Sequence, residues 1–332
     1  MTADLLYAAL GLVILLLAGD SLVKGAVNLS LRLGVPALIV SLTIVAFGTS
    51  APELLIAVKA VPDNAPGIAF GNVVGSNTAN VLLVLGVPAL ISGLKTDECD
   101  TRRNYVFMLA ATALFIALCF AGPLTWVHGL ILLAGLSFVL YDAFVSARTH
   151  RRDAIRGAAD AAAELGEEGE AEEEEEEIEG ADPTLAGWKI GMFLVLGLIG
   201  LPLGADLLVD SAVNIARVIG VSETVIGLTL VAVGTSLPEL ATTVMAALRR
   251  QADVALGNVI GSNVFNLLAI IGIATFVGDM PLPPEMLRFD IWVMLASSLL
   301  LMPFVFLGWN MTRIWGVVLT GLYFVYVLIL LF

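Results

Sequence analysis

The 332-residue chain is 59% hydrophobic and 14% charged, whereas soluble proteins average roughly 45–50% apolar and about 25% charged residues. This composition excludes soluble enzyme folds, and the unbroken apolar stretches exclude the alternating pattern of a membrane β-barrel. We therefore expect an all-α membrane protein. The formal net charge of −14 comes mainly from one segment, because residues 164–182 hold twelve of the thirty acidic residues.

Apolar runs of about 20 residues, the length needed to cross a bilayer, predict ten transmembrane helices. They lie at approximately residues 4–22, 36–60, 67–93, 104–121, 125–146, 185–208, 222–247, 253–278, 289–307 and 312–332. The segment 147–184 begins basic and ends in a run of glutamates, a composition that predicts a disordered linker. We therefore divide the chain into a five-helix unit at 1–146, an acidic linker at 147–184 and a second five-helix unit at 185–332.

The distribution of Lys and Arg predicts the orientation of these helices. With the N-terminus outside, thirteen of the sixteen basic residues fall on the cytoplasmic side and three fall outside. Short cytoplasmic loops carry such an excess of positive charge. The sequence therefore predicts extracellular termini and a cytoplasmic acidic linker.

The two five-helix units are related by an internal repeat. Residues 34–86 align without a gap with residues 220–272, at an offset of 186, and 24 of the 53 positions are identical. Because five is an odd number of spans, equivalent helices enter the membrane from opposite sides, which predicts two inverted five-helix repeats. Inverted repeats are typical of secondary transporters, whose binding site lies near the membrane midplane.

The most unusual repeated motif is Gly-Thr-Ser-x-Pro-Glu, at residues 48–53 and 234–239. A proline inside a helix removes one N–H donor, so it frees a backbone carbonyl in the preceding turn. The glutamates that follow, Glu53 and Glu239, lie in the middle of apolar spans, where an ionised side chain is costly and functional. The two motifs therefore predict a cation site at two broken helices.

A second repeated motif, Gly-Asn-x-x-Gly-Ser-Asn-x-x-Asn, occupies residues 71–80 and 257–266. Its serine and final asparagine are four residues apart and share a helix face. Together the two motifs offer carboxylates, hydroxyls, amides and carbonyls but no His or Cys, which favours hard cations such as Ca2+ or Na+ over zinc, copper or iron. Ser, Thr and Asn in membrane helices also hold helices together, and Asn77 and Asn263 could serve packing alone.

These paired motifs resemble the α-repeats of the cation/calcium exchanger superfamily, most closely its sodium/calcium exchanger branch, over the whole chain except 147–184. The resemblance implies ten helices, extracellular termini and four central cation sites. For calcium, it implies binding by Glu53, Glu239 and the carbonyls of Thr49 and Thr235. For sodium, the expected ligands are Ser50, Ser76, Ser236, Ser262, the carbonyls of Ala46 and Ala232, and the amides Asn80 and Asn266.

The resemblance also favours one coupling ion. Proton-coupled relatives tend to carry Gly-Asn-x-x-Glu in place of Thr-Ser-x-Pro-Glu, and potassium-dependent relatives carry Asp at the position of Asn266. We therefore expect Na+/Ca2+ antiport by alternating access, with electrogenic export of calcium. A Ca2+/H+ antiporter of the same superfamily is the alternative, and a cation channel and an intramembrane hydrolase are remote alternatives.

No enzymatic activity is expected, since no nucleophile or His lies near the two glutamates and no phosphate-binding Gly-x-x-x-x-Gly-Lys-Ser/Thr loop occurs. We expect no cofactor, because Ca2+ and Na+ are the transported ions. The lipid bilayer is the expected partner, without nucleic acid or an obligatory protein partner. The expected location is the cell membrane of a prokaryote.

Overall fold

The computed structural model describes residues 2–63, 65–97, 99–164, 182, 184–218 and 232–331, which form helices and connecting segments. The first half contains α1 (Thr2–Leu33), α2 (Ala37–Val40), the π-helical η1 (Ser41–Val45), α3 (Ala46–Thr49), α4 (Ala51–Ala60), α5 (Pro66–Ala79), the π-helical η2 (Asn80–Val84), α6 (Gly86–Ser92), α7 (Arg102–Phe120) and α8 (Trp126–Glu164). The second half contains α9 (Gly187–Val218), α11 (Ala232–Thr235), α12 (Leu237–Leu248), α13 (Ala252–Phe265), the π-helical η4 (Asn266–Ile270), α14 (Ile271–Val277), α15 (Pro284–Arg288), α16 (Asp290–Leu299), α17 (Met302–Phe306) and α18 (Arg313–Leu331).

Seven helices of the described residues are long and apolar enough to cross a membrane. The count becomes eight if α2 to α4, which bend by 43° at their break, form one span. Two shorter apolar stretches, Leu237–Leu248 and Asp290–Phe306, follow in the second half. The protein is thus a mostly helical membrane protein over its described residues, and the ten-helix arrangement stays a prediction, since residues 222–231 of the seventh predicted span lie outside the described residues.

Several helices run further than the apolar stretches of the sequence suggest. α1 continues to Leu33 rather than ending near residue 22, and α9 continues to Val218 rather than 208. α8 runs through residues 147–164 of the predicted linker, where alanine and arginine favour a helix. Residues 165–181, which hold the glutamate run, lie outside the described residues.

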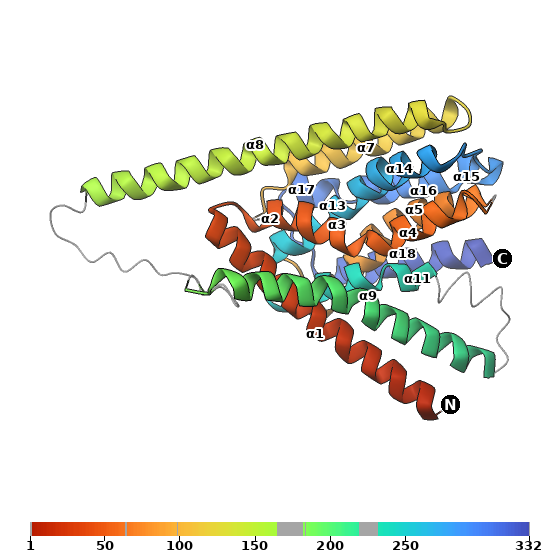
Figure 1. The fold of residues 1–332 in the computed structure, drawn as a ribbon, viewed down its shortest axis with the longest axis horizontal. Helices are drawn as coiled ribbons and strands as arrows, with labels where there is room; N and C mark the ends of the chain where they lie inside the picture. Colours follow the sequence, from red (N-terminus) through yellow and green to blue (C-terminus); the bar gives the residue numbers. More distant parts are fainter. Residues whose placement is uncertain are drawn as a thin grey trace.

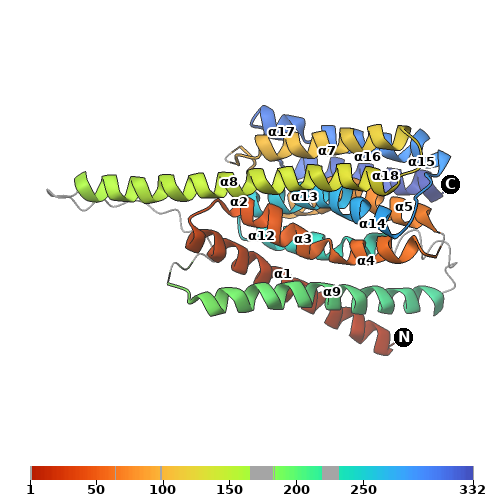
Figure 2. The ribbon, with the colours of Figure 1, turned by 45° about the horizontal axis from the view of Figure 1, so that its top comes forward.

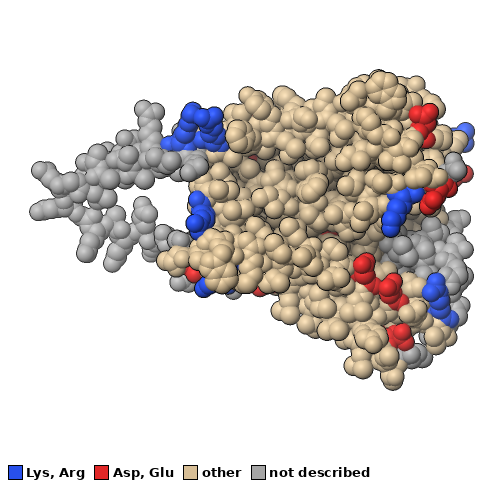
Figure 3. All heavy atoms as spheres, in the orientation of Figure 1, with Lys and Arg blue, Asp and Glu red and all other residues tan. Residues whose placement is uncertain are grey.

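The helices lie mostly along one axis, and the two termini lie at the same end of the molecule (Figure 1). The spans Pro66–Ser92 and Ala252–Val277 form the centre, with 78% and 89% of their apolar windows buried. The outer helices expose large apolar side chains such as Leu6, Leu17 and Ile314. Figure 3 shows a broad uncharged belt on this face, between Lys, Arg, Asp and Glu side chains at the two ends. An apolar exterior of this kind suits lipid rather than water.

α1 and α9 lie side by side in Figures 1 and 2 and run antiparallel. A Cβ atom added at Gly11 would meet Leu208, and one added at Gly197 would meet Leu22. Later residues of α1 therefore contact earlier residues of α9, as in any antiparallel pair. Small residues allow this close approach of two membrane helices. Beyond the pair, Asp20 on α1 accepts an ion-pair hydrogen bond from Arg249 at the end of α12, with 2.5 Å between Oδ1 and Nε.

The repeat in the sequence is also a repeat of helix boundaries. α5 and η2 begin and end 186 positions before α13 and η4, and α3 lies 186 positions before α11. Helices α1 and α9, which begin the two halves, are antiparallel, as expected for an inverted pair. Equivalent positions of the repeat therefore carry the same helix break and the same π-helical turn, η2 and η4, in both halves.

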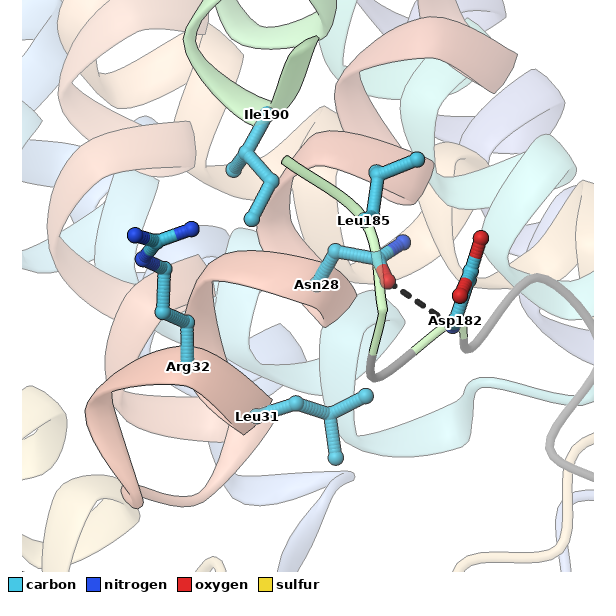
Figure 4. Close-up of a pocket in the computed structure, with 6 residues that line it drawn as sticks. All are labelled: Asn28, Leu31, Arg32, Asp182, Leu185 and Ile190. Carbon is cyan, nitrogen blue, oxygen red and sulfur yellow. Dashed lines mark hydrogen bonds between the residues drawn. The ribbon is translucent and has the colours of Figure 1, made fainter. Parts of the chain in front are cut away.

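The residues that precede α9 are attached to the end of α1. Asn28 Oδ1 accepts a hydrogen bond from the main-chain N–H of Asp182 at 2.9 Å, beside a hollow of about 100 Å³ (Figure 4). The hydroxyl and N–H of Thr184 donate to the Asp182 carboxylate and hold its pKa below the ordinary value. This contact joins the end of the predicted linker to α1.

The close contact of α1 and α9 generates a test of the fold. Gly197→Ala should lower the free energy of unfolding by about 1–3 kcal/mol, because the new Cβ would lie 2.6 Å from Leu22 Cβ. Gly191→Ala on the same helix is the matched control, since a Cβ there meets nothing within 4 Å. Thermal unfolding of the purified protein in detergent measures both, and equal midpoints for the two variants would contradict the packing described.

Candidate functional site

The candidate site lies where two membrane helices are interrupted. The breaks fall at Ser50 and Ser236, whose backbone angles are nearly the same, φ −84° and ψ 6° against φ −90° and ψ 5°. Pro52 and Pro238 follow in the first turns of α4 and α12, where a missing N–H is tolerated. The predicted interruption of both helices is thus confirmed. It places the ends of short helices in the interior of the molecule.

The two glutamates occupy the first turns after these breaks. Glu53 is 1% exposed and Glu239 is 0% exposed. The N-terminal turn of a helix favours a negative charge. Ser50 Oγ donates to Glu239 Oε1 at 3.3 Å, a contact between the two halves of the chain. The Oε2 atoms of both glutamates are buried and have no hydrogen-bond partner among the described residues, so each carboxylate has one oxygen available to a ligand.

Unpartnered oxygen atoms are concentrated around these carboxylates. Buried polar side-chain atoms in native proteins almost always have a partner. α12, which carries Glu239, packs against η2, and α4, which carries Glu53, packs against η4. In the part of the chain that the structure describes, the buried side-chain atoms without a partner are Glu53 Oε2, Asn80 Oδ1, Ser236 Oγ, Glu239 Oε2, Asn266 Oδ1 and Thr320 Oγ1. Five of these six belong to residues that the sequence predicts to bind ions.

Thr49 joins the first helix break to α13. Its hydroxyl contacts the carbonyl of Ala46 and the Oδ1 of Asn258, both at 3.3 Å, and lies 3.5 Å from Ser262 Oγ. The Ala46 carbonyl also accepts a hydrogen bond from the Ser50 N–H. The structure therefore brings the predicted residues Ala46, Thr49 and Ser262 together, with the Ala46 carbonyl already in contact with two donors.

The remaining predicted residues lie on the same elements. Ser76 is buried on α5, one turn before Asn80, and Thr235 ends α11 beside the break. Ala232 begins α11, and its side chain lies outside the described residues.

Four asparagines belong to the site although they are absent from the predicted ligand set. Asn72 and Asn258 donate to the main-chain carbonyls of Glu53 and Glu239, at 3.3 and 3.4 Å. Asn77 and Asn263 hydrogen-bond across the two halves. Their identity at equivalent positions of the repeat is the signal that marks them in the sequence.

The donor set suits a hard cation. The described residues contain no group of three or more His, Cys, Asp or Glu side chains that could hold a metal ion. The site instead combines two carboxylates with neutral hydroxyl and amide oxygens, the ligand types that Ca2+ takes. A cation placed here would meet two negative charges and partners that have no other hydrogen bond.

Comparison with known proteins agrees with this geometry. The model of the family "Sodium/calcium exchanger protein" matches residues 4–145 and 189–332. The sodium/calcium exchanger MaX1 of Methanosarcina acetivorans is 35% identical over 100% of this chain and 99% of its own length. The putative antiporter CaxA of Alkalimonas amylolytica is 33% identical over 91% and 89%.

Among solved structures, the sodium-calcium exchanger NCX_Mj soaked with Na+ and Sr2+ superposes with a TM-score of 0.78. It is 30% identical in sequence, and the match covers 98% of this chain and 97% of the exchanger. The resemblance predicted from the two motifs is confirmed. The chain belongs to the sodium/calcium exchanger family and is therefore an ion transporter rather than an enzyme.

Proposed function

We propose that this protein exchanges Na+ for Ca2+ across a cell membrane by alternating access. The observation that carries the proposal is the cluster of buried, unpartnered oxygen atoms around Glu53 and Glu239. Two carboxylates balance the charge of one Ca2+. Membership of the sodium/calcium exchanger family supports the same substrates.

Two neighbouring sets of ligands follow from this proposal. Glu53 and Glu239 bind Ca2+ together with the carbonyls of Thr49 and Thr235. The Na+ ligands are Ser50, Ser76, Ser236, Ser262, the carbonyls of Ala46 and Ala232, and the amides of Asn80 and Asn266. Ser50 of the Na+ set donates a hydrogen bond to Glu239 of the Ca2+ set, and this contact supports the close placement of the two sets.

The burial of the two carboxylates supports exchange rather than leak. An empty site would carry two unpaired charges through a medium of low dielectric constant, which is strongly unfavourable. Bound Ca2+ or Na+ removes most of that cost. Only the loaded states then change access from one side to the other, which makes transport an obligatory exchange.

The proposed architecture is two inverted five-helix repeats with ten spans, both termini outside and the acidic linker in the cytoplasm. The matched helix boundaries and the antiparallel pair α1 and α9 support the inversion. The excess of Lys and Arg in the loops on the linker side supports the orientation. α1 and α9 form the moving pair, since they lie at the edge of the bundle (Figure 2).

Sodium is the proposed coupling ion, because both helix breaks carry Thr-Ser-x-Pro-Glu. With three Na+ entering per Ca2+ expelled, one net charge moves inward, and the membrane potential contributes about 2.3 kcal/mol per 100 mV to calcium export. Calcium/proton antiport is the alternative, since protons on Glu53 and Glu239 would neutralise the same site.

A gradient experiment tests the proposal directly. Proteoliposomes loaded with Na+ and diluted into Na+-free medium should take up 45Ca2+, and an inside-positive potential set with K+ and valinomycin should increase the uptake. Vesicles that carry only a pH gradient are the control. Uptake driven by the pH gradient alone would replace sodium coupling with proton coupling, and no uptake with either gradient would contradict calcium exchange.

Removal of one carboxylate charge tests the site. Glu53→Gln and Glu239→Gln should each lower 45Ca2+ uptake on the order of 100-fold or more. Each variant removes one negative charge that balances the buried Ca2+, and the loss of one partner from a buried ion pair costs about 3 kcal/mol or more. Glu285→Gln, at an exposed position on α15, is the matched control and should transport normally. Near-normal uptake by both site variants, with the same helical content as the wild type, would contradict the assignment.

A further inference from the structure

Four asparagines form a closed hydrogen-bond network across the two halves of the chain. Asn77 Nδ2 donates to the main-chain carbonyl of Asn263 at 3.2 Å, and Asn263 Nδ2 donates to that of Asn77 at 3.4 Å. The amide of Asn266 donates to Asn77 Oδ1, and that of Asn80 donates to Asn263 Oδ1, both at 3.0 Å. All four side chains are at most 1% exposed.

The two main-chain carbonyls determine the orientation of every amide in this network. A carbonyl oxygen only accepts hydrogen bonds, so Asn77 and Asn263 must turn their Nδ2 atoms toward these carbonyls. Their Oδ1 atoms then face the amides of Asn266 and Asn80. Because an Oδ1 atom only accepts hydrogen bonds, these two amides must donate from Nδ2. The Oδ1 atoms of Asn80 and Asn266 are consequently left on the other side, and both are buried without a partner.

We propose that Asn77 and Asn263 are positioning residues that hold the amide oxygens of Asn80 and Asn266 toward the transported cation. This inference rests on the proposed function and assigns a role to two residues outside the ligand set. Without the network, an amide could turn its NH2 group toward the ion and repel it. The network also requires a hydrogen-bond donor at positions 80 and 266. An ionised carboxylate at either position has no donor, so it would face and repel the Oδ1 atom of Asn263 or Asn77.

A purely structural role and the orienting role differ in how mutations combine. If Asn77 acts through Asn266, its removal has no further effect on ion affinity once the Asn266 amide is absent. Asn80 is held by Asn263 instead. The effect of removing Asn77 should therefore persist when Asn80 is absent. Non-additive changes of this kind identify residues that act through one another.

The experiment is a double-mutant cycle on the purified full-length protein, with the dissociation constant for Na+ measured by competition against bound 45Ca2+. Asn77→Ala should weaken Na+ binding about tenfold, as expected for an ion that loses one oriented oxygen. The double variant N77A/N266A should bind as N266A alone does, whereas N77A/N80A should bind about tenfold more weakly than N80A. Thr78→Val is the matched control, because this buried hydroxyl bonds only within its own helix, to the Val74 carbonyl, and the affinity should not change.

Unchanged affinity in N77A, or equal losses in the N266A and N80A backgrounds, would overturn the inference. Should N77A fail to elute as a monodisperse protein, N263A combined with N80A or N266A makes the same test in the other half, with the two backgrounds exchanged. A wild-type protein that binds neither Ca2+ nor Na+ would overturn the proposed function and this inference with it. Wild-type binding with additive losses would overturn this inference alone.

Discussion

The structure depends on two carboxylates buried in the centre of a membrane protein with one oxygen of each left unpartnered. Burial of an unpaired charge is among the most costly arrangements available to a protein. In the proposed function, a bound cation offsets that cost, and the neutral oxygens around Glu53 and Glu239 complete its shell. The molecule therefore combines a cluster of polar atoms inside a largely apolar interior with apolar side chains on its outer helices.

Sequence duplication explains how this centre is built, and its departures from symmetry indicate how the two halves differ. The breaks at Ser50 and Ser236 and the π-helical turns η2 and η4 occur at equivalent positions. Yet Ser50 donates to Glu239, whereas Ser236 Oγ has no partner among the described residues. The ion pair of Asp20 with Arg249 cannot be repeated either, because the position equivalent to Arg249 is Asp63. Such inequivalent halves agree with the proposed alternating access, in which two inverted repeats differ in any one conformation.

The sequence predicted the features that depend on local chemistry. Prolines in apolar runs predicted the helix breaks, and glutamates beside them predicted the site. The ends of α1 and α9 were not predictable from hydropathy, because Asp20 and Lys24 lower the hydropathy of a helix that continues to Leu33. The orientation of the Asn77 amide was also beyond reach, since it depends on a main-chain carbonyl 186 residues away that only the fold brings near.

The most direct test of a cation held between the two glutamates is anomalous diffraction from crystals of this protein soaked in Sr2+ or Ca2+. The account predicts a single strong divalent peak within about 2.3–2.6 Å of carboxylate oxygens of both Glu53 and Glu239, and its loss in the variant that carries glutamine at both positions. Clear density for both side chains without such a peak, or a divalent peak held by other residues, would contradict it.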